Sequence, residues 1–434
     1  MKHKLLFSLL LVSAPVTDAL GADVWSYADC VDYAMSHNIT LQKVRLAEET
    51  AAYDLEEAKA QWEPTLDFAT THGFTNYPWG ESGAKNAYNS SYGLNAGWTV
   101  WNGGARESTI KRNRLQTEIS RLATGNQVRS LKTDLLQVYI NILYARDAIR
   151  ISEEAATLSG AQAERARQFM EAGKISKVDY AQLQAQYEQD CYAVVNARGV
   201  YDTRRMELKR LLELGIDSDI ELVDVEWTAE QVLAELPPID ESFAMAVATD
   251  LQLQQLNLEK EGSALDVDLA KASGKPKISL NAGVGTGYSA PGNAFGTSLK
   301  RALNESVGLT LSVPILDNKK SGMAVAKAKV GEMNAQLDID QRSTELSQEV
   351  ENWYIDTRSA QARFEAGEGQ LRAAELSHEL VNERFNLGLV HPLELMSAHN
   401  TLVEARYSLL QARYMAMLGR KMIEYYRTAD VILN

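Results

Sequence analysis

The sequence lacks any long apolar run. No stretch approaches the roughly 18–20 apolar residues that a membrane-spanning helix needs. A helical membrane span is therefore excluded, and any membrane crossing must use strands. Backbone groups inside lipid have to be hydrogen-bonded, and strands achieve this only in a closed barrel.

Cysteine and histidine are also scarce. The chain has 2 cysteines and 6 histidines, and neither type shows ligand spacing. No serine or cysteine lies in a nucleophile motif, so we expect no metal site, no cofactor and no enzymatic activity. Cys30 and Cys191 are predicted at different heights of a helical rod, roughly 20 Å apart, so we expect no disulfide between them.

Acidic residues outnumber basic residues in this sequence. Lys and Arg total 44 against 58 Asp and Glu, which gives a net charge of −14. This balance argues against nucleic acid, and against an anionic membrane surface, as the main partner.

Residues 1–21 have the pattern of a signal peptide. A basic start (Lys2, His3 and Lys4) precedes an apolar core from Leu5 to Ala14, and Ala19-Leu20-Gly21 is a small-residue cleavage site. The alternative is an uncleaved interfacial anchor.

The stretch from Tyr88 to Trp101 alternates between apolar and small or polar residues, which is the pattern of a strand with one apolar face. Three similar strands are predicted over 65–77, 278–288 and 306–313, so that the four form hairpins over 64–101 and 276–316. The residues predicted to face lipid are Leu94, Trp98, Val100, Leu280, Val284, Leu309 and Leu311. The alternative is a pair of soluble hairpins on a helical rod, and for Trp101 the alternative to a membrane-interface position is core packing.

Long segments without proline surround the hairpins and are predicted to be helical. The predicted helices cover 26–62, 105–171, 176–214, 240–272, 319–387 and 392–427. Two of them carry apolar seams with coiled-coil 4-3 spacing: Leu131, Leu135, Val138, Ile142, Ala145, Ile149 in the first, and Leu346, Val350, Trp353, Thr357, Ala360, Phe364 in the second. Each such helix would be on the order of 100 Å long.

The same order of elements occurs twice, with an offset of about 215 residues. Tyr139 falls on Tyr354, and Gly173 falls on Gly388. We therefore divide the chain into a first repeat (22–214), a linker (215–239) and a second repeat (240–434). Four strands cannot close a barrel, because single-chain membrane barrels have at least eight, so several chains must share one. The predicted fold is a mixed α+β membrane protein.

This arrangement resembles the TolC family of outer-membrane efflux channels. The resemblance covers nearly all of the mature chain, and its motifs are Trp98-Thr-Val-Trp-Asn-Gly-Gly and Leu311-Ser-Val-Pro-Ile-Leu-Asp before the long helices. Two glycine turns are also similar: Glu171-Ala-Gly-Lys-Ile-Ser and Asn386-Leu-Gly-Leu-Val-His.

The resemblance implies a homotrimer in the outer membrane of a Gram-negative bacterium. Its 12-stranded barrel would continue into an α-helical tunnel in the periplasm. It would act as the exit duct of a tripartite efflux system, with a periplasmic adaptor (membrane fusion) protein and an inner-membrane RND-type pump or ABC exporter as partners. The alternatives are a duct for type I protein secretion and, from another class, a periplasmic coiled-coil scaffold without a barrel.

The resemblance also suggests site residues at the tip of the tunnel. Adaptor docking is expected at the helix turns, which contain Gly173, Lys174, Gly388, Leu389 and Val390. Asp179 and Glu394 occupy the places of the acidic residues that narrow the aperture in the family. The alternative for each is an ordinary solvated acid. Where some relatives carry a basic latch residue this chain has Val390, and where some carry a further acid it has Ser397.

Overall fold

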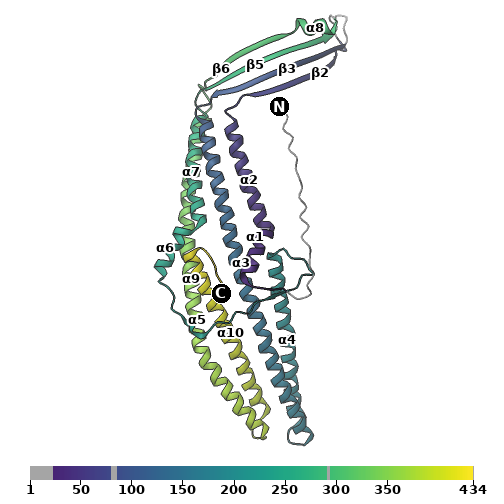
Figure 1. Cartoon of the computed structure of the whole chain (residues 1–434), viewed down its shortest axis with the longest axis vertical. Helices are drawn as coiled ribbons and strands as arrows, with labels where there is room; N and C mark the ends of the chain where they lie inside the picture. The colour runs from purple at the N-terminus through teal and green to yellow at the C-terminus, as the bar shows by residue number, and fades with distance from the viewer. Residues whose placement is uncertain (1–22, 80–85, 291–293, 434) are drawn as a thin grey trace.

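The protein is a long helical rod with a four-stranded sheet at one end and two tight helix turns at the other (Figure 1). The computed structural model describes residues 23–79, 86–290 and 294–433. The predicted signal peptide lies outside these residues.

Elements of the first repeat are α1 (Tyr27–His37), α2 (Ile39–Ala60), β2 (Thr65–Asn76), β3 (Asn86–Trp101), α3 (Ala105–Glu171) and α4 (Lys177–Leu211). Those of the second are α6 (Ile239–Thr249), α7 (Leu251–Ala272), β5 (Lys277–Ala290), β6 (Asn304–Ser312), α9 (Lys320–Asn386) and α10 (Pro392–Thr428).

The two repeats match in length, which confirms the internal duplication. Helices α1 and α6 each have 11 residues, α2 and α7 each have 22, and α3 and α9 each have 67. At a rise of about 1.5 Å per residue, each long helix extends roughly 100 Å. The mixed α and β fold predicted from the sequence is confirmed.

Two predicted helices are each divided in two, so the predictions of single helices over 26–62 and 240–272 were wrong. The first is interrupted at Asn38 and the second at Asp250, both with extended backbone dihedrals. Each residue caps the following helix: the Asn38 side chain accepts from the Leu41 amide, and that of Asp250 accepts from the Leu253 amide. Side-chain capping compensates for the lost backbone hydrogen bonds, so no proline or glycine is needed to end the helix.

Four short elements lie in regions predicted to be terminus, linker or loop. Within the linker are β4 (Ile220–Leu222) and α5 (Ala229–Leu233), and β4 pairs in parallel with β1 (Asp23–Trp25) near the start of the chain. Helix α8 (Phe295–Arg301) lies in the loop between β5 and β6.

The core lies where the long helices pack along their seams. Leu135, Ile142, Val350 and Phe364 are all buried. Cys30 is buried in the same core and Cys191 is partly exposed on α4, and both are free thiols.

Two tyrosines at equivalent positions of the repeats connect this core to the linker. The Tyr139 hydroxyl donates to the Val223 carbonyl oxygen, and that of Tyr354 donates to the Pro237 carbonyl oxygen. Both side chains are fully buried. Each repeat therefore contains both a long helix and a buried tyrosine that joins this helix to the linker by a hydrogen bond.

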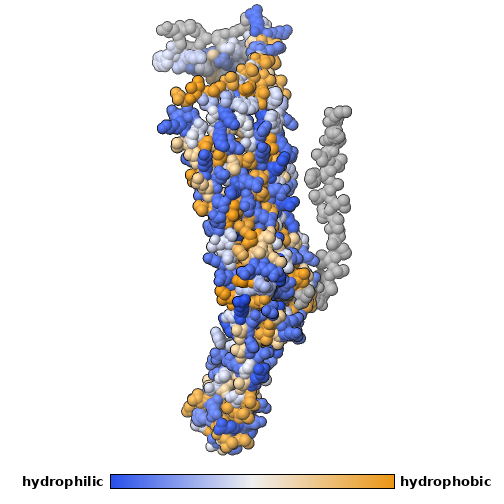
Figure 2. Space-filling view, turned by 90° about the vertical axis from the view of Figure 1, so that its left-hand side faces the viewer, coloured by the Kyte–Doolittle hydropathy of each residue, from blue (hydrophilic) through white to orange (hydrophobic). Residues whose placement is uncertain are grey.

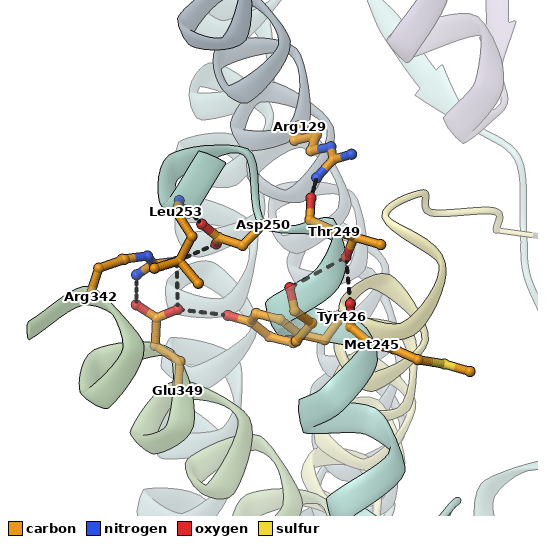
Figure 3. A network of polar contacts seen from close by, with 9 residues as sticks. Arg129, Met245, Thr249, Asp250, Leu253, Arg342, Glu349 and Tyr426 are labelled. Atoms are coloured by element: carbon orange, nitrogen blue, oxygen red, sulfur yellow. Dashed lines mark hydrogen bonds and ion pairs between the residues drawn. The ribbon is translucent and has the colours of Figure 1, made fainter. Parts of the chain in front are cut away.

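A charged network occupies the break between α6 and α7 (Figure 3). Arg342 on α9 donates to Asp250 at 2.8 Å and to Glu349 at 2.9 Å. Tyr426 on α10 donates to the same Glu349 at 3.2 Å. Only 13% of the Arg342 side chain and 12% of the Asp250 side chain are exposed. Burial lowers the pKa of Arg342, but its hydrogen bonds to Asp250 and Glu349 outweigh burial and the net pKa is raised. The network therefore joins α7, α9 and α10 through a guanidinium that stays charged.

Candidate functional site

The sheet has one apolar face, which follows from its register. The strand order is β2-β3-β5-β6, and all neighbours are antiparallel. Trp98 aligns with Leu280, and Leu280 aligns with Leu309, so the three form an apolar row across three strands. Leu94 and Val284 form another pair on the same face. Directly aligned residues of neighbouring strands share a face.

The opposite face carries small and polar residues. Thr99 aligns with Ser279, which aligns with Thr310, while Asn95 aligns with Gly283. The sheet is therefore amphipathic, as the period-two pattern predicts.

Val100 is the one predicted lipid-facing residue that departs from this register. The pairing of β3 with β5 shifts between Thr99 and Trp101, and Trp101 aligns with Ile278, which is on the apolar face. Because the shift places Val100 outside the alternation, Trp101 takes the next position on that face.

At the same end of the sheet, the Trp98 indole donates to the Trp62 carbonyl oxygen at 2.9 Å, which joins the sheet to the end of α2.

Within the part of the chain that the structure describes, the apolar face and the two edges of the sheet are uncovered. Exposed fractions reach 67% for Phe68 on β2 and 71% for Leu309 on β6. Within the described residues, β2 and β6 each pair with only one neighbour. An exposed apolar face of this kind marks an interaction surface, and an open edge can pair with a further strand.

At the opposite end of the rod, two turns of the same geometry connect α3 to α4 and α9 to α10. Gly173 has φ +71° and Gly388 has φ +74°, in the left-handed region that glycine adopts without steric cost. The Lys174 amide donates to the Phe169 carbonyl oxygen, and the Leu389 amide donates to that of Arg384, which is the Schellman pattern.

Asp179 has a structural role at the first turn. Its carboxylate accepts from both the Ser176 amide at 3.1 Å and the Ser176 hydroxyl at 2.9 Å, which completes a capping box at the start of α4. The hydrogen bonds from Ser176, together with the nearby His391, lower the pKa of Asp179, so the carboxylate stays ionised.

One side-chain contact connects the two turns. His391 Nε2 lies 3.2 Å from Asp179 Oδ1, although the two residues belong to different repeats. Glu394 pairs instead with Arg384 across its own turn, at 3.3 Å. His391 is the residue directly after Val390.

The tip combines a buried aromatic contact with an exposed apolar surface. Phe169 and Phe385 pack with ring centroids 5.7 Å apart. Outside this contact, Leu387 is 74% exposed and Leu389 is 65% exposed. Figure 2 shows apolar side chains gathered at this end of the rod. Beside them is a groove of about 590 Å³ between α9 and α10, and its lining includes His391 and Glu394.

The sequence predicted the positions of the two turns, but it did not predict the side chains that contact Asp179 and Glu394. Arg384 pairs with a residue ten positions later, and His391 pairs with one in the other repeat. The one sequence feature that could have pointed to the missed partner of Asp179 was the position of His391 next to Val390.

Two negative findings concern the described residues alone. Residues 23–79, 86–290 and 294–433 include no group of three or more His, Cys, Asp or Glu side chains arranged to hold a metal. In the same part of the chain, no helix has the length and apolar character needed to cross a membrane.

Comparison with known proteins assigns the family. The chain is 22% identical over 284 residues to the alkaline protease secretion protein AprF of Pseudomonas aeruginosa, a match that covers 64% of this chain and 57% of AprF. It is 19% identical to the outer membrane efflux protein BepC of Brucella suis, over 82% of this chain and 71% of BepC. The solved structure of CusC superposes with a TM-score of 0.78 at 15% identity and covers 93% of this chain and 92% of CusC.

A family model described as outer membrane efflux protein matches residues 31–213 and 244–417. These two segments take in both repeats and leave out the linker. The chain therefore belongs to the outer membrane efflux protein family.

Proposed function

We propose that three copies of this chain form the outer-membrane exit duct of a tripartite efflux system. The twelve strands of a trimer close one barrel, and the long helices continue it as a tunnel through the periplasm. A periplasmic adaptor binds at the tip, and an inner-membrane pump supplies the energy. The duct itself has no catalytic step.

The observation that carries this proposal is the open amphipathic sheet. Its strands have 9 to 16 residues, which is enough for a membrane strand of about 9–11 residues. Among residues 23–79, 86–290 and 294–433 both edges are unpaired, and an unpaired edge is not tolerated in lipid. When three copies join edge to edge, β2 of one copy pairs with β6 of the next, so the backbone hydrogen bonds of both edges are made. The apolar face of the sheet then points towards lipid.

The tip supplies the docking surface and the aperture. The turn at Gly388-Leu389-Val390 exposes the apolar side chain of Leu389 at the end of the rod, and the turn at Gly173-Lys174 exposes Lys174. Threefold symmetry converts Asp179 and Glu394 into rings of three carboxylates each, which attract cations and disfavour anions. The contact of His391 with Asp179 holds the two turns of each chain together and acts as a latch of the closed tip.

A duct for type I protein secretion is the second candidate. It is supported by the similarity to AprF, whose name describes alkaline protease secretion. The two candidates share the barrel and the tunnel, and they differ in the cargo and in the inner-membrane partner.

Deletion of the gene tests both candidates. For an efflux duct, we expect the deletion strain to become more sensitive to toxic small molecules, and complementation by the wild-type gene to restore resistance. Loss of a protein from the culture supernatant with unchanged drug sensitivity would instead favour secretion. A mature chain that purifies without detergent as a water-soluble monomer would rule out both.

Replacing Glu394 with glutamine tests the aperture. We expect the preference for potassium over chloride in planar bilayers to fall about two- to tenfold, because the trimer loses three carboxylates from a narrow mouth. Glu57→Gln is the control, since it removes the same charge from an exposed position on α2, far from the tip. An unchanged reversal potential in Glu394→Gln would assign Glu394 to the solvated surface.

A further inference from the structure

A buried polar cluster joins the four tunnel helices above the tip. His399 on α10 lies with Nε2 at 2.8 Å from Asp190 Oδ2 on α4. Gln162 on α3 contacts His378 on α9 at 3.0 Å. The two histidine rings lie 6.1 Å apart in an edge-on arrangement. The cluster therefore connects the α3–α4 hairpin to the α9–α10 hairpin twice.

All four side chains are withdrawn from solvent. His399 is 0% exposed and the other three are 4–7% exposed. Coiled-coil interiors favour apolar residues, and a buried polar group is costly unless its partners are present. The four residues thus form a buried polar contact between the two hairpins.

In the arrangement that the structure shows, the contact between Gln162 and His378 suits a neutral imidazole. Its contact with Gln162 joins Nε2 of the imidazole to Nε2 of the amide, so the amide donates and the imidazole nitrogen accepts. A protonated His378 carries a hydrogen on that nitrogen and cannot accept. Two other atoms of the cluster, Gln162 Oε1 and His399 Nδ1, are buried without a partner within the described residues. Both atoms can accept a hydrogen bond, and neither is bonded to His378.

The charges that face the cluster also oppose a second positive charge. His399 and Arg406 approach His378 from α10, and Asp190 on α4 is engaged by His399. Glu154 on α3 and Glu375 on α9 both pair with Arg406. These three acidic groups are thus engaged by Arg406 and His399.

The pKa directions agree with this geometry. Burial, with contributions from His399 and Arg406, lowers the pKa of His378. Burial raises the pKa of Asp190, but hydrogen bonds from His399 and Ser159 outweigh it and lower the net pKa. A histidine with a lowered pKa in the folded state stabilises the fold above its unfolded pKa of about 6.5, and this contribution is lost as the pH falls below that value.

We propose that Gln162, Asp190, His378 and His399 form a proton-sensitive link between the two helical hairpins, which acidification weakens. The consequence for transport rests on the proposed duct: the hairpins must separate for the tip to widen, so a lower pH favours opening. The link would make the resting state of the tip respond to the acidity outside the inner membrane.

Hydrogen exchange on the full-length trimer in detergent tests the link directly. We expect the protection factors of residues 155–166 and 395–403 to fall on the order of tenfold between about pH 7.5 and about pH 5.5, because burial disfavours the protonated form of His378. Protection factors already divide out the intrinsic pH dependence of exchange. Exchange reports the contact whether or not the protein conducts, so a negative result here leaves the proposed duct untouched.

His378→Gln keeps a side chain that can bond Gln162 but removes the titration, so its protection should no longer depend on pH. His37→Gln is the matched control, because this exposed histidine lies on α1, and it should respond like the wild type. Arg406→Gln provides an independent variant: loss of this cation should move the midpoint of the response to higher pH. A pH-independent wild type, or a His378→Gln variant that responds fully, would overturn the proposal, as would an unmoved midpoint in Arg406→Gln.

Discussion

Replacing Arg342 with alanine is expected to lower the free energy of unfolding by about 3–5 kcal/mol, because the change leaves a buried carboxylate without its cation. Asp250, which is 12% exposed, would lose its 2.8 Å contact with the guanidinium. Glu349 would keep only its bond from Tyr426 (Figure 3). Denaturant unfolding of the purified protein in detergent, followed by helical circular dichroism, measures the change.

The control for this variant is a surface ion pair. Arg198 contacts Glu153 at 2.6 Å, but the two side chains are 62% and 47% exposed. Arg198→Ala should therefore cost less than about 1 kcal/mol. Equal losses in the two variants would mean that the network at the α6–α7 break contributes no more than a surface contact.

Placing arginine at Leu309 is expected to prevent stable insertion of the sheet into the outer membrane. A charge on the lipid face of a membrane strand costs about 2–4 kcal/mol near the bilayer midplane, and a trimer carries three of them. The fraction of protein that migrates as a heat-sensitive oligomer from outer-membrane preparations measures insertion.

Thr310→Arg is the matched control, because Thr310 is the next residue of β6 and lies on the opposite, polar face with Ser279. This variant should insert normally and change only the conductance. If both variants insert equally well, the apolar face does not contact lipid. If only Thr310→Arg fails, the assignment of the two faces is reversed.

Strands and long helices were predictable because their signals are local. The alternation from Tyr88 to Trp101 predicted β3, and in the structure this strand begins slightly earlier, at Asn86. The segment 105–171 without proline predicted α3 with the same bounds. Each pattern follows from a side-chain period that neighbouring residues express by themselves.

What the sequence could not predict depends on contacts between distant residues. Nothing near His399 indicates a partner 209 positions earlier, because the contact depends on how the two hairpins align. The helix break at Asp250 has no glycine or proline, and it depends on Arg342 from another helix as well as on its own cap. Val100 lost its place on the apolar face through a register shift, and strict alternation cannot reveal such a shift.

The matching turns at Gly173 and Gly388 bear on how many adaptor molecules one duct can hold. Both have the same backbone geometry, and both follow a helix of 67 residues, so they end the rod at a similar level. A ring of three chains would then display six helix turns, in which the Gly173 turn and the Gly388 turn alternate. A protein that recognises the backbone geometry shared by both turns would bind in six copies. A protein that distinguishes Lys174 of one turn from Leu389 of the other would bind in three.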